Sequence, residues 1–132
     1  CDIVGAVAAC LPDSNVDFLY GVGGSPETII STAAIKTLGG GIEAQIYDRD
    51  LTGTLDPVFS NESNKWFAVG DILPMEHLIS SSCVFAATGI TNGSILKGVQ
   101  STGGKLITNS VFMKSHENTV RWIKTHHNGD RR

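Results

Sequence analysis

The chain has 132 residues, of which 41% are hydrophobic and 17% are charged, and its formal net charge is −3. This length predicts one globular domain over residues 1–132 that buries about two thirds of its unfolded surface. The acidic balance, with no basic stretch longer than Arg131-Arg132, argues against nucleic acid or an anionic membrane surface as a partner. No apolar run approaches the roughly 20 residues that cross a bilayer, so we expect a soluble protein.

The cysteines indicate a reducing compartment. The chain has three cysteines, Cys1, Cys10 and Cys83. Their odd number argues against a disulfide framework, and the absence of Cys-x-x-Cys or Cys/His metal-ligand spacing argues against a structural zinc site. We therefore expect a cytoplasmic protein. The chain starts at cysteine instead of methionine and enters an apolar segment directly, so we expect it to be part of a longer polypeptide.

The first 47 residues predict an α/β unit. Residues 3–11 are small and apolar, as in a short buried helix, and residues 16–20 have the dense apolar character of a central parallel strand. A glycine-rich turn at 21–27 then leads into a helix that runs to residue 38 before three glycines. Residues 42–47 alternate as a second strand. The order strand, helix, strand predicts a right-handed crossover unit with the glycine turn at its ligand-binding end.

The rest of the chain predicts more strands than helices. The polar stretch at 48–64 is typical of an exposed connection. Its successors, in order, are a strand at 65–69, a short helix at 72–79, a buried strand at 83–88, a glycine-flanked loop at 89–93, a short helix at 94–99, and strands at 105–114 and 119–124 joined by a turn at 115–118.

The glycine turn is the main candidate site. Bare backbone amides between a strand and a helix suit an anionic ligand. Glu27 would repel that anion unless a cation lay between them, which points to phosphate and metal handled together. For Glu27 alone, complementing the helix dipole is the simpler explanation. Asp2 also has two possible roles, because an aspartate at this position could be the N-cap of the first helix or could bind a ligand.

Two further ligand hypotheses follow from local patterns. The turn begins as a dinucleotide fingerprint does, with Glu43 downstream, but Pro26 replaces the glycine that permits close helix–strand packing. His126-His127 resembles a metal-binding pair, yet it lies in a polar tail where a solvated end is the better interpretation. No serine, histidine and aspartate pattern indicates a covalent nucleophile.

Several motifs together resemble the carboxyl-terminal half of the class II fructose-1,6-bisphosphatases. The residues that carry the resemblance are Asp2, the segment LPDSNVDFLYGVGGSPE at 11–27, AAIKTLGG at 33–40, FAATGITNG at 85–93 and NTVR at 118–121. The loop ending in Pro-Glu and the Thr-Gly-Ile-Thr-x-Gly segment are far more specific together than either is alone. The resemblance extends over nearly the whole chain.

The resemblance implies a layered α/β fold, the carboxyl-terminal domain of an inositol monophosphatase-like sugar phosphatase. It implies hydrolysis of fructose 1,6-bisphosphate to fructose 6-phosphate, with sedoheptulose 1,7-bisphosphate as a further substrate, supported by Mn²⁺ or Mg²⁺. By the same resemblance Glu27 is the one metal ligand in this half, while Gly24 contacts the sugar phosphate through its backbone and Asp2 holds sugar hydroxyls. The other metal carboxylates belong to a missing amino-terminal half, and the complete protein is a homo-oligomer.

The chain also departs from the family pattern. Thr28 stands where the family usually has glycine, Cys1 replaces the glycine of an Asp-Gly-Asp segment, and the connection at 48–64 is shorter than the family's helical insertion. These departures keep a second hypothesis open, a non-catalytic sugar-phosphate-binding or interaction domain of the same fold. In either case we expect no turnover by this chain alone.

Overall fold

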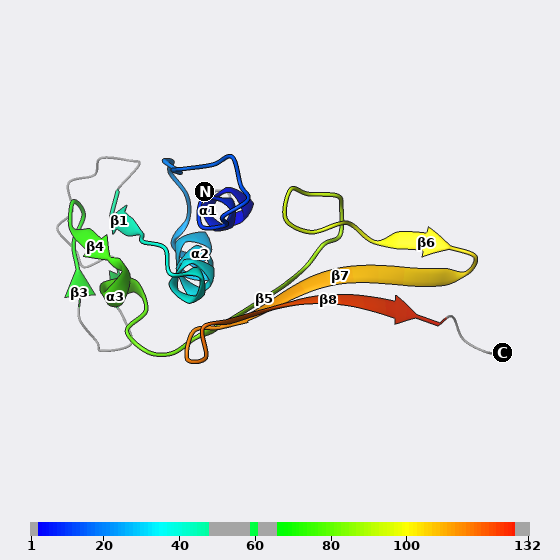
Figure 1. Cartoon of the computed structure of the whole chain (residues 1–132). Coiled ribbons are helices and arrows are strands. Elements are labelled where there is room, and N and C mark those ends of the chain that lie inside the picture. Colours follow the sequence, from blue (N-terminus) through cyan, green and yellow to red (C-terminus); the bar gives the residue numbers. More distant parts are fainter. Residues whose placement is uncertain (1–2, 48–58, 61–65, 129–132) are drawn as a thin grey trace.

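The computed structural model describes residues 3–47, 59–60 and 66–128 and has an α/β fold with antiparallel sheets (Figure 1). Its helices are α1 (Ile3–Ala8), α2 (Ser25–Leu38) and α3 (Met75–Leu78). Its strands are β1 (Glu43–Gln45), β2 (Phe59–Ser60), β3 (Trp66–Phe67), β4 (Ile72–Pro74), β5 (Val84–Thr88), β6 (Gln100–Thr102), β7 (Lys105–Lys114) and β8 (Thr119–His127). No helix among these described residues is long and apolar enough to cross a membrane.

Helix α2 begins and ends as its sequence predicts. Pro26 occupies the first turn, where a missing N–H leaves no helical hydrogen bond unmade, and Glu27 and Lys36 complement the dipole at the two ends. Gly39 follows the last turn with a φ of 75°, a left-handed conformation that glycine adopts without steric strain. These start and end signals therefore fix the first turn of α2, in which Glu27 lies.

The main sheet is built on the long strand β7. β8 pairs with β7 over nine residue pairs, from Leu106 opposite His127 to Lys114 opposite Thr119, and β5 and β6 pair with the other edge of β7. The predicted strands at 83–88, 105–114 and 119–124 are thus confirmed, and the last one extends three residues further. Asn118, with a φ of 47°, closes the turn between β7 and β8.

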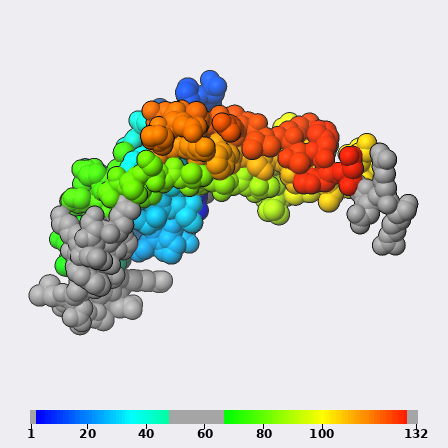
Figure 2. All heavy atoms as spheres, turned by 90° about the horizontal axis from the view of Figure 1, so that it is seen from below, coloured from blue at the N-terminus to red at the C-terminus, as the bar shows by residue number. Residues whose placement is uncertain are grey.

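One hydrophobic core lies between the helices and one face of this sheet. Val7 of α1 and Ala34 of α2 pack in the same cluster as Phe85, Val111 and Met113 from β5 and β7. These positions alternate along the strands, so that one face of the sheet turns toward the helices. Figure 2 shows the opposite side, where atoms of β8 form much of the surface.

A second, smaller cluster packs beside the first turns of α2. Phe67, Leu73 and Leu78 form it, with partly buried Ile29 from α2 against them. Among the described residues Cys10 and Cys83 are free thiols, and burial raises the pKa of Cys10. The described part of the chain therefore holds two apolar clusters that share α2.

The predicted crossover unit is not formed. Residues 16–20 are extended but belong to no strand among the described residues, and β1, predicted at 42–47, pairs antiparallel with β4. A strand needs a neighbour that supplies backbone hydrogen bonds, and none of the described strands lies beside residues 16–20. The described residues therefore do not contain the expected central parallel strand.

Other predictions need correction in part or lie outside the described residues. The helix expected at 72–79 is half strand, β4, and half helix, α3. Residues 94–99 form no helix but an irregular segment that leads into the unexpected strand β6. The predicted connection at 48–64 lies mostly outside the described residues, apart from β2, which pairs with β3. His126 and His127 end β8, so they do not lie in an irregular tail, but both are exposed, as the prediction of a solvated end requires; His127 Nε2 is 3.0 Å from Thr108 Oγ1.

Candidate functional site

Gly24 and Glu27 lie against each other at the start of α2. Gly24 is the N-cap, with extended φ and ψ of −73° and 157°, and no side chain caps the helix there. A Cβ at position 24 would collide with the carboxylate of Glu27, so the glutamate folds back over the backbone of the glycine turn. The carboxylate and the free helix N-terminus are thus adjacent, which is the arrangement predicted for a phosphate and a cation held together.

Thr28 fits this turn without distortion. Its Oγ1 donates to the carbonyl oxygen of Gly24 at 3.0 Å, and its backbone N–H donates to the same oxygen at 3.1 Å. Thr32 Oγ1 continues the pattern by donating to the Thr28 carbonyl at 2.7 Å. Thr28 is helical, so a β-branched residue is tolerated where the resembling family usually has glycine. This departure leaves the position of Glu27 unchanged.

The Thr-Gly-Ile-Thr segment belongs to a tightly closed loop after β5. The backbone N–H of Gly98 donates to Asn92 Oδ1 at 2.9 Å, and Val99 N–H donates to the Ile90 carbonyl at 3.1 Å. A Cβ at Gly98 would collide with the backbone of residues 90–92, so glycine is required for this closure. Asn92 is not among the site residues predicted from the sequence. The signal available was an asparagine before glycine in a loop.

An apolar cavity of about 250 Å³ lies between α1 and this loop. Ile3 and Val7 of α1 form one wall, Phe85 and Val111 lie on the sheet side, and Thr91 comes from the loop. Ile3, which lines this cavity, is the residue directly after Asp2. Asp2 itself lies outside the described residues, and neither Gly24 nor Glu27 lines the cavity.

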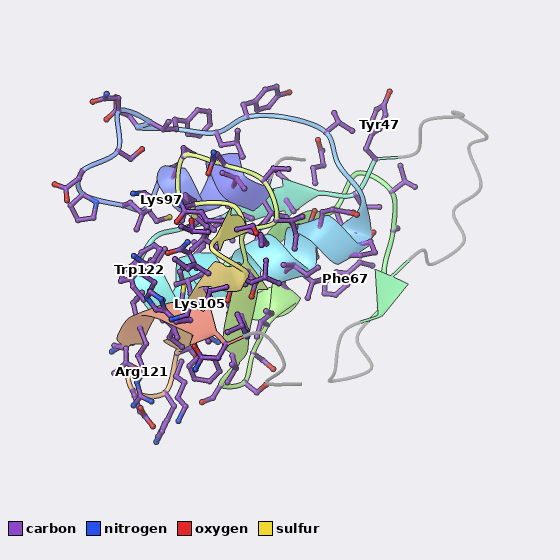
Figure 3. All side chains as sticks on the ribbon, turned by 90° about the vertical axis from the view of Figure 1, so that its right-hand side faces the viewer. Tyr47, Phe67, Lys97, Lys105, Arg121 and Trp122 are labelled. Carbon is purple, nitrogen blue, oxygen red and sulfur yellow. The ribbon has the colours of Figure 1, made fainter. Side chains whose placement is uncertain are left out.

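A second cavity, of about 270 Å³, lies over the other part of the sheet. Lys97, Trp122 and Lys124 line it, and Figure 3 shows Lys97 and Trp122 on neighbouring parts of the molecule, the loop before β6 and strand β8. The side-chain nitrogen of Asn109, another lining residue, is buried without a hydrogen-bond partner. Neither cavity includes Glu27.

Glu27, the predicted metal ligand, does not lie in a group of metal-binding side chains among the described residues. Within residues 3–47, 59–60 and 66–128, no group of three or more His, Cys, Asp or Glu side chains could hold a metal ion. Glu27 offers a carboxylate, a donor that suits Mn²⁺ and Mg²⁺, but one carboxylate does not make a protein site for these ions. Its fit to such an ion is therefore that of a single ligand in a larger set.

Comparison with known proteins identifies the family to which this sequence belongs. The family model of bacterial fructose-1,6-bisphosphatases encoded by glpX matches residues 1–127. The chain belongs to this family. Among its relatives, a class 2 fructose-1,6-bisphosphatase of Haemophilus influenzae is 37% identical over 96% of the chain, and fructose-1,6-bisphosphatase 1 class 2 of Escherichia coli K12 is 31% identical over 99% of it.

The chain spans only part of these bacterial fructose-1,6-bisphosphatases. The matched regions cover 40% of the Haemophilus protein and 42% of the Escherichia protein. The glycine turn with Glu27 and the loop after β5 both lie within the span that the family model matches. The comparisons thus place the predicted site residues within a region that the family shares, and the role of each stays a prediction.

Proposed function

We propose that this chain is the carboxyl-terminal part of a metal-dependent bisphosphatase that hydrolyses the 1-phosphate of fructose 1,6-bisphosphate. The observation that carries the proposal is the Glu27 carboxylate folded over Gly24 at the start of α2. Family membership supports the same reaction class. Sedoheptulose 1,7-bisphosphate, which has the same phosphate-bearing end, is a second expected substrate, and the complete enzyme is expected to be a homo-oligomer.

Each site residue has a distinct role in this proposal. The backbone of Gly24 and the N-terminus of α2 bind phosphoryl oxygens, because backbone N–H groups and the helix dipole favour negative charge there. Asp2 accepts hydrogen bonds from the sugar hydroxyls. Glu27 provides one carboxylate ligand for a divalent cation. No side chain of this chain serves as a covalent nucleophile.

Mn²⁺ or Mg²⁺ supplies charge neutralisation and activation of water when bound. Glu27 would hold such an ion from the side of the glycine turn, with the remaining carboxylates contributed by the part of the longer protein that this chain does not include. The turn amides orient the phosphate so that its charge is stabilised as it develops. By itself this chain is expected to release no phosphate, since the described residues offer no group of side chains that could hold the ion without further ligands.

The decisive experiment measures phosphate release from fructose 1,6-bisphosphate by the complete protein with Mn²⁺. Glu27→Gln removes the charge but keeps the shape, and it should lower kcat/KM by about 100-fold or more. Glu43→Gln, on the exposed position of β1, is the matched control and should leave kcat/KM within about twofold. Equal activity of the wild type and Glu27→Gln would refute the metal-ligand role.

The same assay separates the alternative function. A non-catalytic sugar-phosphate-binding domain would bind fructose 1,6-bisphosphate in calorimetry but release no phosphate in any metal. A dinucleotide-binding domain would need the strand–helix–strand crossover, and the described residues do not form one. Phosphate release by the complete wild-type protein would therefore support the enzyme over the non-catalytic binding domain.

A further inference from the structure

The cavity of about 270 Å³ between the loop before β6 and the β7–β8 hairpin has positively charged side chains at its wall. Lys97 comes from the loop and Lys124 from β8, and neither forms an ion pair with another described residue. None of the described aspartates and glutamates lines the cavity, although the chain as a whole has a formal net charge of −3. Two ammonium groups at one cavity without a counter-charge favour an anionic ligand.

The register of the sheet places this cavity on the face that also carries the core. Asn109 lies opposite Lys124, and Val111 lies opposite Trp122. Directly opposite residues of an antiparallel pair share a face, and so do alternate residues along one strand. Because Val111 is buried in the core, Asn109, Trp122 and Lys124 all lie on the core face. Trp122 is nonetheless 53% exposed, so the cavity lies where this face opens to solvent.

The loop that carries Lys97 is held in place on both sides of this residue. Ile95 and Leu96 are partly buried against the core cluster. Directly after Lys97, the backbone N–H of Gly98 donates to Asn92 Oδ1 and closes the loop. Lys97 therefore has a fixed backbone, while its exposed side chain is free to adjust to a ligand. A site whose backbone is set before binding loses less conformational entropy when the ligand enters.

Asn109 supplies a hydrogen-bond donor that the described residues leave without an acceptor. Its side-chain nitrogen Nδ2 is buried and has no partner among them. Buried amide groups are normally hydrogen-bonded, and an unpaired one lowers the stability of the fold. The terminal torsion of an asparagine side chain has broad energy wells, so a small rotation turns this N–H₂ group toward the cavity. An oxygen atom of a bound anion would then accept its hydrogen bond.

Trp122 adds an aromatic surface beside the charged groups. In Figure 3 it lies near Lys97, which lines the same cavity. An indole ring packs well against an apolar or planar group. The cavity of about 270 Å³ is slightly smaller than the usual ligand pocket of about 300–1,000 Å³. It therefore suits a small molecule with one charged end and one apolar end.

We propose that this cavity binds a small oxyanion, a molecule whose phosphate or carboxylate group contacts Lys97, Asn109 and Lys124 and whose apolar or planar part packs on Trp122. Phosphate and carboxylate share the chemistry that these residues recognise, because both present charged oxygen acceptors to ammonium and amide donors. The inference does not depend on the proposed hydrolysis, since no residue of the glycine turn lines the cavity.

Fluorine NMR of the complete protein, labelled with 5-fluorotryptophan, tests for binding at this cavity. Phenyl phosphate and benzoate are added separately to metal-free protein at constant ionic strength, and Trp122→Phe identifies the Trp122 resonance. We expect a saturable shift of that resonance with at least one of the two anions, and the anion that produces it distinguishes phosphate from carboxylate. No saturable shift with either, or an equal shift with uncharged benzyl alcohol, would overturn the proposal.

Substitutions test the residues that contact the anion. Lys97→Met and Lys124→Met should each weaken binding of the responding anion about tenfold, and so should Asn109→Asp, which replaces the donor by a negative charge. Arg121→Met is the matched control, because Arg121 is also exposed on β8 but lies opposite Phe112, on the other face of the sheet. It should leave the dissociation constant within about twofold. Equal weakening by Arg121→Met would contradict a site at this cavity.

The same resonance shows whether other parts of the longer polypeptide fill the cavity instead. In the free protein the Trp122 fluorine should show a solvent isotope shift between H₂O and D₂O, and a saturating anion should reduce that shift. A fluorine without a solvent isotope shift in the free protein would show that the cavity is already covered, and it would overturn the proposal.

Discussion

The carboxylate of Glu27 occupies the space that a side chain at Gly24 would need. A side chain at position 24 would therefore displace the flexible end of the Glu27 side chain, whereas the backbone itself, with a φ of −73°, permits any residue there. Two residues of the glycine turn thus form a single steric unit. A substitution at Gly24 should therefore move the carboxylate of Glu27.

Gly24→Ala should displace the Glu27 carboxylate and lower phosphate release by the complete protein about 10- to 100-fold. Gly21→Ala is the matched control, because a Cβ at Gly21 meets no atom within 4 Å and its φ is not positive. It should retain activity within about twofold. Steady-state kinetics with Mn²⁺ measure both variants, and equal losses in the two would contradict the steric coupling.

Lys36→Met should destabilise the chain. The Lys36 ammonium donates to the carbonyl oxygens of Ile79 at 2.8 Å and Ser81 at 2.9 Å, so it fastens the end of α2 to the segment before β5. Loss of hydrogen bonds from a charged donor lowers the free energy of unfolding by about 1–3 kcal/mol. Urea denaturation followed by tryptophan fluorescence measures this change. Lys124→Met, at an exposed position of β8, should change the midpoint little.

Met113→Ala should lower the free energy of unfolding by about 2–5 kcal/mol, because Met113 is 0% exposed in the core beneath the helices. Ile72→Ala removes a comparable number of methyl and methylene groups at a residue that is 62% exposed, and it should cost less than about 1 kcal/mol. The same denaturation experiment compares the two. Similar decreases in the free energy of unfolding for the two variants would contradict the position of Met113 in the core.

The turn between β7 and β8 should weaken in acid. A hydrogen bond from Lys114, and then its charge, hold the pKa of Glu117 below its ordinary value of 4.5. A lowered folded-state pKa means that this contribution to stability is present above the ordinary pKa and is lost as pH falls through the folded-state value.

Lys114→Met should accordingly raise the pKa of Glu117 toward its ordinary value. Titration of the side-chain carboxyl by NMR measures the shift, with Lys105→Met, at the other end of β7, as the control. An unchanged pKa in Lys114→Met would show that the ion pair is not formed in solution.

Local sequence was a sound guide where local contacts decide the structure. Helix α2 has its proline, acidic and glycine signals within one segment, and the hairpin of β7 and β8 has alternation joined by a short polar turn. Both were predicted from neighbours in the chain. The start of α2 after the glycine turn was predicted in the same way, because a helix start is a local feature, whereas the role of Glu27 stays a prediction.

The failures have a different origin. Residues 16–20 have the composition of a strand, but pairing depends on residues far away in the sequence, and the described chain offers none. The antiparallel pairing of β1 with β4 is equally non-local. Residues 94–99 lack a helix because Gly98 and Asn92 close the loop instead. The position of Asp2 stays a prediction, as does its role.

The unbroken register of β7 with β8 has a consequence for the order of folding. These two strands meet through a four-residue turn, whereas residues 46–71 separate the partners β1 and β4. Closing a longer loop loses more chain entropy before any contact repays it. We therefore expect the hairpin to form first, within about 1–10 μs, and to serve as the template on which β5 and the helices assemble.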